Sequence, residues 1–372
     1  MLTRGREIVA RAGFNPYRVD FDAARFIDLA SNNYLGLAGR VEVKEAAIAA
    51  IREHGASLCG TPVASGHSAY ARRLAERLAA FCKLEAALFF PSCYQANNGI
   101  FALLAGEDDI IVIDRAAHAS LIAGARASGA KISPFVHNSL EHLARVLERA
   151  GHYRKIFVVT ESVFSTEGAI APLPEILALC RVHDAIPVVD DSHGIGVLGA
   201  GGRGVLEHFA ITDFPGVYTA SLGKALAGMG GVVAGKAEVM ERLEYLCPGL
   251  IYSTALTPPA LGTLHGALDV IEREFPALGQ RLWHYRDIIA DALGAKRLGG
   301  EAPINVVACG DAETAVRLTA ALYRNGILAT PFIEPSVPKD ACVVRLIAGA
   351  GLAEAAAQQA AACLRTCIQA CF

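Results

Sequence analysis

The strongest constraint in this sequence is a pair of apolar, strand-like runs that each end in reactive side chains. The first run, Ile186–Val189, is followed by Asp190 and His193 in VVDDSHGIG. Strand carboxyl ends face the ligand crevice in open α/β sheets, so we expect both side chains near a ligand. The second run, Val217–Ser221, is followed by Lys224 in TASLGKALAGMGG. Taken separately neither half is specific, since D-D-x-H is commonly a capped turn and a lysine after a strand is commonly a surface charge.

A carboxylate, an imidazole and a lysine at strand ends, with glycines that permit close backbone approach, suit a pyridoxal phosphate site. Lys224 would hold the aldehyde of this cofactor as a Schiff base. Asp190 would keep the ring nitrogen protonated, so that the ring acts as an electron sink. Because both halves occur in this order in one chain, pyridoxal 5'-phosphate is the cofactor that we expect.

The composition is that of a compact globular protein. Of 372 residues, 53% are hydrophobic and 19% are charged, which leaves room for a large core and two domains and argues against disorder. The net charge of −3 gives no reason to expect nucleic acid or an anionic membrane as partner. No apolar run approaches the ~20 residues of a membrane span. The start, MLTRGREIVARAG, is too charged for a signal peptide.

Ten cysteines could indicate disulfides or a metal site, but seven of them are scattered. Cys363, Cys367 and Cys371 recur every four residues, along one face of a predicted helix. That spacing could hold a metal, yet no histidine lies nearby and the chain has no C-x-x-C pair. We therefore expect a packed helix face, no metal, and a reduced, cytoplasmic protein.

Strand, turn and helix N-terminus follow one another in AALFF and PSCYQANNG. This arrangement favours an anion, because unsatisfied backbone N–H groups and the helix dipole point at it. Ser92, Cys93 and Tyr94 form the predicted turn. Tyr94 has an alternative interpretation as a core-packing residue.

Arg345 lies inside the apolar run CVVRLIA, where an unpaired charge would be costly. A buried arginine is normally paired, either with a substrate carboxylate held in bidentate fashion or with an internal aspartate or glutamate. Spacing alone leaves both possibilities open.

Successive buried strands and helices, from IIVID through KIFVVTE to the strand before Asp190, predict a mostly parallel sheet covered by helices. Pro258 and Pro259 open a helix expected to end near residue 275, with another helix near 278–293. We expect an N-terminal arm over 1–40, a large cofactor-binding domain over 41–257 and a small C-terminal α/β domain over 258–372.

These motifs, together with SNNYLGL, RAAHAS, LIYST and PSVP, arrive in an order that resembles the α-oxoamine synthase family over nearly the whole chain. The resemblance implies the fold-type I aminotransferase architecture, with a seven-stranded, mostly parallel sheet in the large domain. It also assigns cofactor contacts by motif. His118 would stack on the ring, Ser165 and His193 would bind a cofactor oxygen, and the phosphate turn and the S-L-G-K motif would supply the others: Ser92, Cys93, Tyr94, Ser221.

The resemblance further implies a reaction and an assembly. Asn32 and Arg345 would bind the carboxylate of a small amino acid, which condenses with an acyl thioester of coenzyme A or acyl carrier protein, usually with decarboxylation. His193 could instead contact the thioester carbonyl. Ser253 and Thr254 would reach the cofactor phosphate of a neighbouring subunit, giving a homodimer with shared active sites. Transamination on the same fold and a non-catalytic partner subunit are the alternatives.

Two positions depart from the family pattern. Pro62 stands where many members have an arginine, which bears on recognition of an acid-bearing acyl substrate. The segment 349–352 reads GAGL where the family usually has S/T-A-x-H, which bears on how the acyl substrate is handled.

Overall fold

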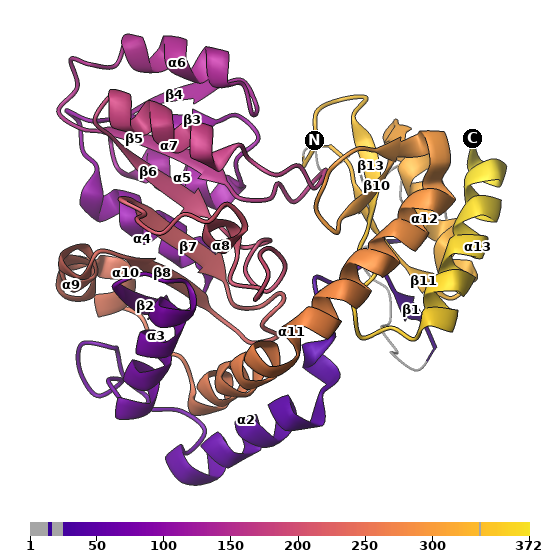
Figure 1. The fold of residues 1–372 in the computed structure, drawn as a ribbon, viewed down its shortest axis with the longest axis horizontal. Helices are drawn as coiled ribbons and strands as arrows, with labels where there is room; N and C mark the ends of the chain where they lie inside the picture. Colours follow the sequence, from indigo (N-terminus) through magenta and orange to yellow (C-terminus); the bar gives the residue numbers. More distant parts are fainter. Residues whose placement is uncertain (1–13, 17–24, 335) are drawn as a thin grey trace. The chain divides into compact units, whose positions relative to one another are not determined.

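The computed structural model describes residues 14–16, 25–334 and 336–372 (Figure 1). The chain divides into two compact units. Unit 1 comprises residues 1–36, 165–169 and 277–372, and unit 2 comprises residues 37–164 and 170–276. The predicted domain bounds at residues 40 and 257 remain a prediction.

Unit 2 is built on a seven-stranded sheet with the order β2-β8-β7-β6-β5-β3-β4. Strand β8 runs antiparallel to both of its neighbours and the other pairs are parallel, which confirms the predicted mostly parallel sheet. The strands are β2 (Ala86–Phe90), β3 (Ile110–Asp114), β4 (Lys131–Phe135), β5 (Ile156–Glu161), β6 (Ala185–Asp190), β7 (Val217–Ser221) and β8 (Gly231–Gly235). Strands β3 and β5 are buried throughout, as expected for uninterrupted apolar runs covered on both faces.

Helices cover this sheet and connect its strands: η1 (Leu37–Gly39), α2 (Val41–His54), α3 (Ala69–Phe81), α4 (Cys93–Leu104), α5 (Ala119–Ala127), α6 (Leu140–Glu148), α7 (Leu173–Val182), α8 (Val205–His208), α9 (Ala237–Leu246) and α10 (Pro248–Ile251). One core cluster joins the sheet to side chains of α4, α5, α9 and α10, including Phe101, Leu121 and Leu243. These helices therefore shield one face of the sheet from water. Serine N-caps begin α3, α4 and α6.

Unit 1 contains a four-stranded antiparallel sheet with the order β12-β13-β10-β9, and a two-stranded parallel pair of β1 and β11. Its elements are β1 (Ile27–Asp28), η2 (Gly294–Lys296), β9 (Arg297–Leu298), β10 (Asn305–Gly310), α12 (Ala312–Arg324), β11 (Ile327–Leu328), β12 (Thr330–Phe332), β13 (Cys342–Leu346) and α13 (Glu354–Cys371). The apolar run ILATPFI (327–333) is divided at Ala329 between two different sheets.

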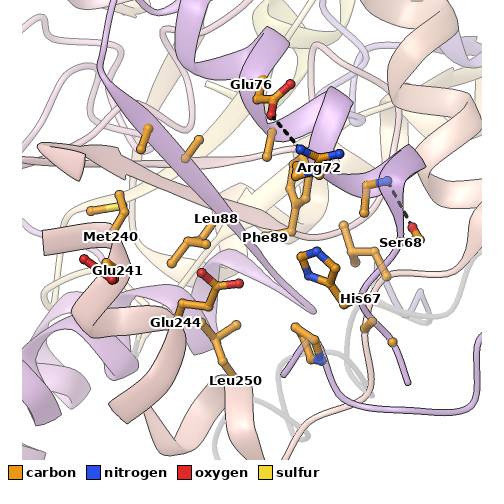
Figure 2. A pocket seen from close by; sticks show the side chains of 18 of the residues that line it. His67, Ser68, Arg72, Glu76, Leu88, Phe89, Met240, Glu241, Glu244 and Leu250 are labelled. Atoms are coloured by element: carbon orange, nitrogen blue, oxygen red, sulfur yellow. Dashed lines mark hydrogen bonds and ion pairs between the residues drawn. The ribbon is translucent and has the colours of Figure 1, made fainter. Parts of the chain in front are cut away.

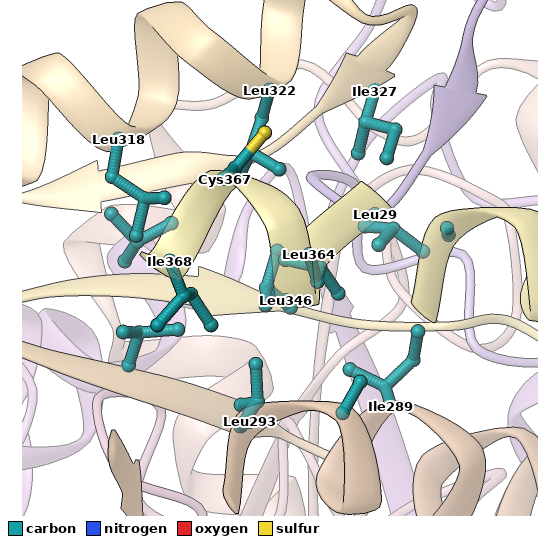
Figure 3. Close-up of a cluster of buried hydrophobic side chains, with 14 of the residues drawn as sticks. Leu29, Ile289, Leu293, Leu318, Leu322, Ile327, Leu346, Leu364, Cys367 and Ile368 are labelled. Atoms are coloured by element: carbon teal, nitrogen blue, oxygen red, sulfur yellow. The ribbon is translucent and has the colours of Figure 1, made fainter. Parts of the chain in front are cut away.

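The core of unit 1 gathers side chains from its sheet and helices, among them Leu293, Leu318, Leu346 and Ile368 (Figure 3). Cys367 and Cys371 are buried in this core. The Sγ atoms of Cys363 and Cys367 lie 3.7 Å apart, and all ten cysteines are free thiols. Among the described residues no group of three or more metal-ligating side chains is placed to hold a metal ion.

Helix α11 (Pro258–Leu293) corrects the expectation of two helices separated near residue 276. Pro276 lies inside a single helix that begins in unit 2 and ends in unit 1. Proline removes one helical hydrogen bond, but Phe275, Leu278 and Leu282 are buried around it. Packing on both sides therefore outweighs the local cost. No helix in the described part of the chain is long and apolar enough to cross a membrane.

Candidate active site

A cavity of about 390 Å³ lies in unit 2 at the carboxyl ends of the parallel strands. Its volume falls within the range usual for small-ligand sites. The lining includes most of the side chains predicted for cofactor chemistry: Ser92, Cys93, Tyr94, His118, Asp190, His193, Ser221 and Lys224. The residues predicted from four separate segments thus meet at one edge of one sheet.

The turn after β2 forms one end of this cavity. Ser92 is the N-cap of α4, and its Oγ accepts the backbone N–H of Gln95 at 3.1 Å. A Cβ at Gly231 would lie 2.5 Å from both the N and the Cα of Cys93, so only glycine allows β8 to begin against this turn. Tyr94 is 53% exposed, which excludes its interpretation as a core residue. The turn therefore presents a helix N-terminus to the cavity, as an anion requires.

Asp190 ends β6 and is almost completely buried. Its Oδ1 accepts the backbone N–H of Ser192 at 3.0 Å, and its Oδ2 accepts Nδ2 of Asn97 at 2.7 Å. The Sγ of Cys93 lies 3.9 Å from the same Oδ2. The neighbouring carboxylate contributes to raising the pKa of the Cys93 thiol, after the larger effect of burial. Asp190 is thus fixed by donors on both oxygens while facing the cavity.

His118 is the N-cap of α5, and its Nδ1 accepts the backbone N–H of Ser120 at 3.2 Å. The same nitrogen lies 2.7 Å from Oγ of Ser120. Burial lowers the pKa of His118, the charge of Asp190 raises it, and the charge of Lys224 lowers it further. The net direction is downward, so the imidazole is neutral over more of the pH range than a free histidine.

The remaining polar side chains of the cavity follow β6 and β7. The backbone N–H of Ser221 donates to Oγ of Ser192 at 2.8 Å, which links the two strand ends beside Lys224. His193 is buried and lines the cavity. Glu161, at the end of β5, is also buried and lines it.

Asp191 points away from the cavity residues into the protein. Its Oδ2 accepts the hydroxyl of Tyr218 at 2.8 Å and the backbone N–H of Val205 at 3.0 Å. A Cβ at Gly194 or Gly204 would collide with this carboxylate, so two glycines pack directly on it. Burial raises the pKa of Asp191 to about 7. Asp191 anchors the loop that follows the strand end carrying Asp190 and His193.

Unit 1 holds a second set of predicted residues. Arg345 is in β13, is only 7% exposed, and has its guanidinium 4.8 Å from the centre of the Phe332 ring. Its Nη1 donates to the backbone O of Ser165 at 3.1 Å, whereas its buried Nε has no hydrogen-bond partner. The buried Oδ1 of Asn32 has none either. Ser165 therefore contacts Arg345 through its carbonyl.

The sequence left two possible partners for Arg345, a substrate carboxylate and an internal aspartate or glutamate, and the structure bears on the second. Within the part of the chain that the structure describes, no carboxylate forms an ion pair with Arg345. Tyr34 is fully buried nearby, and burial raises the pKa of its phenol although the charge of Arg345 opposes the shift. An internal aspartate or glutamate partner is therefore not found among the described residues.

Ser253 and Thr254 do not line the cavity of their own chain. The Oγ of Ser253 accepts Nε2 of Gln95 at 3.2 Å, so Ser253 contacts the first turn of α4 from outside the cavity. The motifs did not predict a further group of polar residues that hold these side chains in place. Ser120 and Ser192 line the cavity, and Asn97 and Thr219 lie behind its lining. Their only local signal is proximity to the PSCY, RAAHAS and VDDSH motifs.

A separate cavity of about 330 Å³ lies in unit 2 between α3, β2 and α9 (Figure 2). Leu88, Met240 and Leu250 line it, and Glu244 and His67 are at its side (Figure 2). Pro62 belongs to its lining, at the position where the sequence departs from the family pattern. None of the side chains predicted for cofactor chemistry lines this second cavity.

The donor set of the first cavity fits pyridoxal phosphate. A helix N-terminus with Ser92 suits the phosphate, and a buried carboxylate on Asp190 suits a protonated ring nitrogen. Lys224 supplies an amine for the aldehyde and His118 a flat ring.

Comparison with known proteins agrees with this chemistry. The family model described as aminotransferase class I and II matches residues 24–364. The 8-amino-7-oxononanoate synthase of Geobacter sulfurreducens is 38% identical over 344 residues, covering 91% of this chain and 88% of that protein.

Solved structures give the same picture. The serine palmitoyltransferase of Sphingomonas wittichii has a TM-score of 0.93 at 26% identity, covering 100% of this chain and 97% of that one. The 8-amino-7-oxononanoate synthase of Francisella tularensis has a TM-score of 0.77 at 27% identity, with coverages of 93% and 99%.

Proposed function

Because this chain belongs to the α-oxoamine synthase family of pyridoxal phosphate-dependent acyltransferases, within the class I and II aminotransferases, we propose that it condenses a small amino acid with an acyl thioester and releases carbon dioxide to give an α-amino ketone. The family and the cofactor follow from the comparisons with known proteins. The two substrates and the roles of individual residues are what we propose.

In the cavity of unit 2, the α4 N-terminus and Ser92 would hold the cofactor phosphate, flanked by Cys93 and Tyr94. Asp190 would hold the ring nitrogen and His118 would stack on the ring. When bound, the cofactor supplies an electron sink for the carbon that loses a proton. Lys224 would hold the aldehyde carbon and then, released as a free amine, accept that proton from Cα of the amino acid.

The amino-acid half of the proposal rests on one observation: Arg345 is buried and its Nε, a donor, has no hydrogen-bond partner. A buried charge without an internal carboxylate is costly unless a ligand pairs with it. An amino-acid carboxylate would accept the guanidinium N–H groups. The Asn32 amide would add the contact that the family motif implies.

The acyl donor is proposed at the level of a thioester on coenzyme A or acyl carrier protein. His193 would donate to the thioester carbonyl or to a cofactor oxygen, and Ser165 and Ser221 would supply further cofactor contacts. Pro62 cannot pair with a distal acid on the acyl chain, which favours an uncharged acyl group. The ten free cysteines support the proposal that the protein works in the reducing cytoplasm.

We also propose an isologous homodimer in which Ser253 and Thr254 complete the phosphate site of the partner. Neither residue lines the cavity of its own chain, and each follows the short helix α10 in a polar turn. A two-fold dimer is the commonest symmetric assembly. Each active site would then need two chains.

The test of the reaction adds glycine, alanine or serine to the cofactor-loaded protein and records the visible absorbance. A panel of acyl thioesters, varied in chain length and carrier, then follows. We expect one amino acid to change the absorbance, and thiol and carbon dioxide to be released only when both substrates are present. Transfer of the amino group to a 2-oxo acid without thiol release would instead show transamination, and no response to any amino acid would indicate a non-catalytic subunit.

The test of the shared site mixes two inactive variants, Lys224→Ala and Ser253→Ala/Thr254→Ala, after the double variant has been shown to be inactive. In a mixed dimer one site collects both defects and the other collects neither. Up to half of the heterodimer sites should therefore recover activity. Subunit exchange without recovery, or a fully active monomer, would contradict the shared site.

A further inference from the structure

A continuous set of hydrogen bonds joins the buried Asp190 to the more exposed His118 along the wall of the cavity. Asn97, on α4, is 0% exposed and donates from Nδ2 both to Oδ2 of Asp190 at 2.7 Å and to Oγ of Ser120 at 2.9 Å. Oγ of Ser120 then lies 2.7 Å from Nδ1 of His118. Two side chains that would contact opposite features of the cofactor are therefore linked through one amide and one hydroxyl.

The orientation of the Asn97 amide follows from its third contact. The hydroxyl of Thr219 donates to Oδ1 of Asn97 at 2.9 Å, so the amide oxygen faces Thr219. Both protons of Nδ2 are then committed, one to Asp190 and one to Ser120. Since Asp190 receives a donor here, its oxygen is an acceptor and needs no proton of its own.

The hydrogen bonds of Ser120 likewise determine which ring nitrogen of His118 carries the proton. Oγ of Ser120 already accepts from Asn97, so its own proton is free to be donated to Nδ1 of His118. Nδ1 also accepts the backbone N–H of Ser120. A proton on Nδ1 would point at that N–H and repel it, so Nδ1 must be unprotonated and act as an acceptor. The neutral imidazole therefore has its proton on Nε2.

This arrangement suits a ring that is protonated at its nitrogen. An imidazolium stacked on such a ring would place two like charges in contact within a buried site, where repulsion is strong. A neutral imidazole avoids that repulsion while the Asp190 carboxylate supplies the opposite charge. The charged or titratable groups near His118 and Asp190 are each other, Lys224, the thiol of Cys93, the buried carboxylate of Asp191, and Glu161 and His193 in the cavity lining.

We propose that Asn97 and Ser120 are positioning residues that hold Asp190 as an acceptor and lock His118 in its neutral, Nε2-protonated form. The inference rests on the proposed roles of Asp190 and His118 at the cofactor. Neither Asn97 nor Ser120 needs to touch substrate. Together they make the protonation states of the two cofactor-facing groups depend on one another.

The test uses holoenzyme with ¹⁵N-labelled histidine, with the His118→Gln variant identifying the His118 signals. The ¹⁵N shifts should show an unprotonated Nδ1 and a protonated Nε2 in the wild type. Ser120→Ala removes one donor to the neutral ring, so the titration midpoint of His118 should rise by about 0.5–1 pH unit. Asn97→Leu removes the amide donor to Asp190 and should displace the pH titration of the cofactor's visible absorbance.

Matched controls lie on the same two helices. Asn98→Ala removes an amide that donates only to the carbonyl of Tyr94, and Ser128→Ala removes a hydroxyl that donates to the carbonyl of Ala125. Both should leave the His118 signals and the absorbance titration unchanged.

If Ser120→Ala and Asn97→Leu bind cofactor and titrate as the wild type does, the inference is wrong, and Ser120→Ala decides alone should Asn97→Leu fail to fold. Because no substrate is added, a wild type that binds cofactor but condenses nothing would overturn the proposed function and leave this test readable.

Discussion

The cavity of unit 2 and the Arg345 region of unit 1 differ in whether their buried polar groups have hydrogen-bond partners. Asp190 has donors on both carboxylate oxygens, and the Asn97 amide that serves it uses both of its own protons. Arg345 has an unpartnered Nε and Asn32 an unpartnered Oδ1, although both atoms are buried. The carboxylate of Asp190 thus has hydrogen-bond partners within the protein on both oxygens, whereas Nε of Arg345 and Oδ1 of Asn32 lack them. We call the first the satisfied region and the second the unsatisfied region.

The difference corresponds to two kinds of ligand. A cofactor that stays through many turnovers benefits from groups held rigidly by the protein, because no reorganisation is then needed when charge develops. A substrate carboxylate must enter and leave at every turnover, so its receptor has to keep a donor free. The satisfied region therefore suits the cofactor and the unsatisfied region suits the amino acid. The predictions below challenge this distinction.

The largest effect is expected at the satisfied region. Asp190→Asn should keep the cofactor bound but lower kcat by roughly 10²–10³-fold, because a neutral amide cannot stabilise a protonated ring nitrogen by charge. Cofactor occupancy from absorbance and kcat from thiol release check the two parts separately. Turnover close to that of the wild type would show that the carboxylate is structural.

A smaller effect is expected at the unsatisfied region. Arg345→Ala should raise the KM or Kd for the amino acid by roughly 10–100-fold, as expected for the loss of a charge-assisted pair worth about 1.5–3 kcal/mol. Affinity for the cofactor should change little.

Arg345→Lys is the matched variant, since it keeps the charge but loses the forked geometry, and it should fall between the two. If Arg345→Ala merely unfolds the protein and Arg345→Lys is stable and binds the amino acid as tightly as the wild type, the arginine belongs to the fold and the comparison fails.

The smallest effect on turnover is expected at Asp191, and its signature is pH-dependent stability. Because burial raises its pKa to about 7 in the folded state, the folded protein holds this proton more tightly than the unfolded chain. The contribution to stability is therefore present at low pH and is lost as pH rises from about 4 through about 7.

Asp191→Asn removes this dependence while keeping an oxygen for Tyr218 and Val205. Relative to the wild type, the variant should gain of order 1 kcal/mol or more in unfolding free energy between pH 5 and pH 8, measured by urea denaturation. Parallel pH profiles for the two proteins would refute the assignment.

Sequence patterns predicted the interior strands of unit 2 and its edge strand β2 well, and its other edge strand, β4, poorly. The runs at β3, β6 and β7 are mostly apolar and mostly buried, as expected for interior strands of a sheet covered by helices. The edge strand β4, with Lys131 and Pro134, carries no such signal, since an edge needs neither full burial nor a complete hydrogen-bond ladder. The sequence wrongly predicted a break near Pro276, because α11 is held together there by tertiary packing that the local sequence does not show.

The predicted site shows a similar limit. Motifs identified the side chains that face the cavity, because their types and order report chemistry directly. Asn97 and Ser120 were missed because their meaning lies in contacts between α4, α5 and β6, which are separated by up to 93 positions in the chain. No local pattern encodes such a pairing.

Lys224, in the cavity of unit 2, is the residue that should carry the cofactor. Borohydride reduction of the purified holoenzyme, followed by digestion and mass mapping, measures this directly, because reduction makes the link between lysine and aldehyde permanent. The account predicts a single labelled peptide that contains SLGKALAG, with the label on Lys224 and none in the Lys224→Ala variant. A label on any other lysine of the wild type would contradict it.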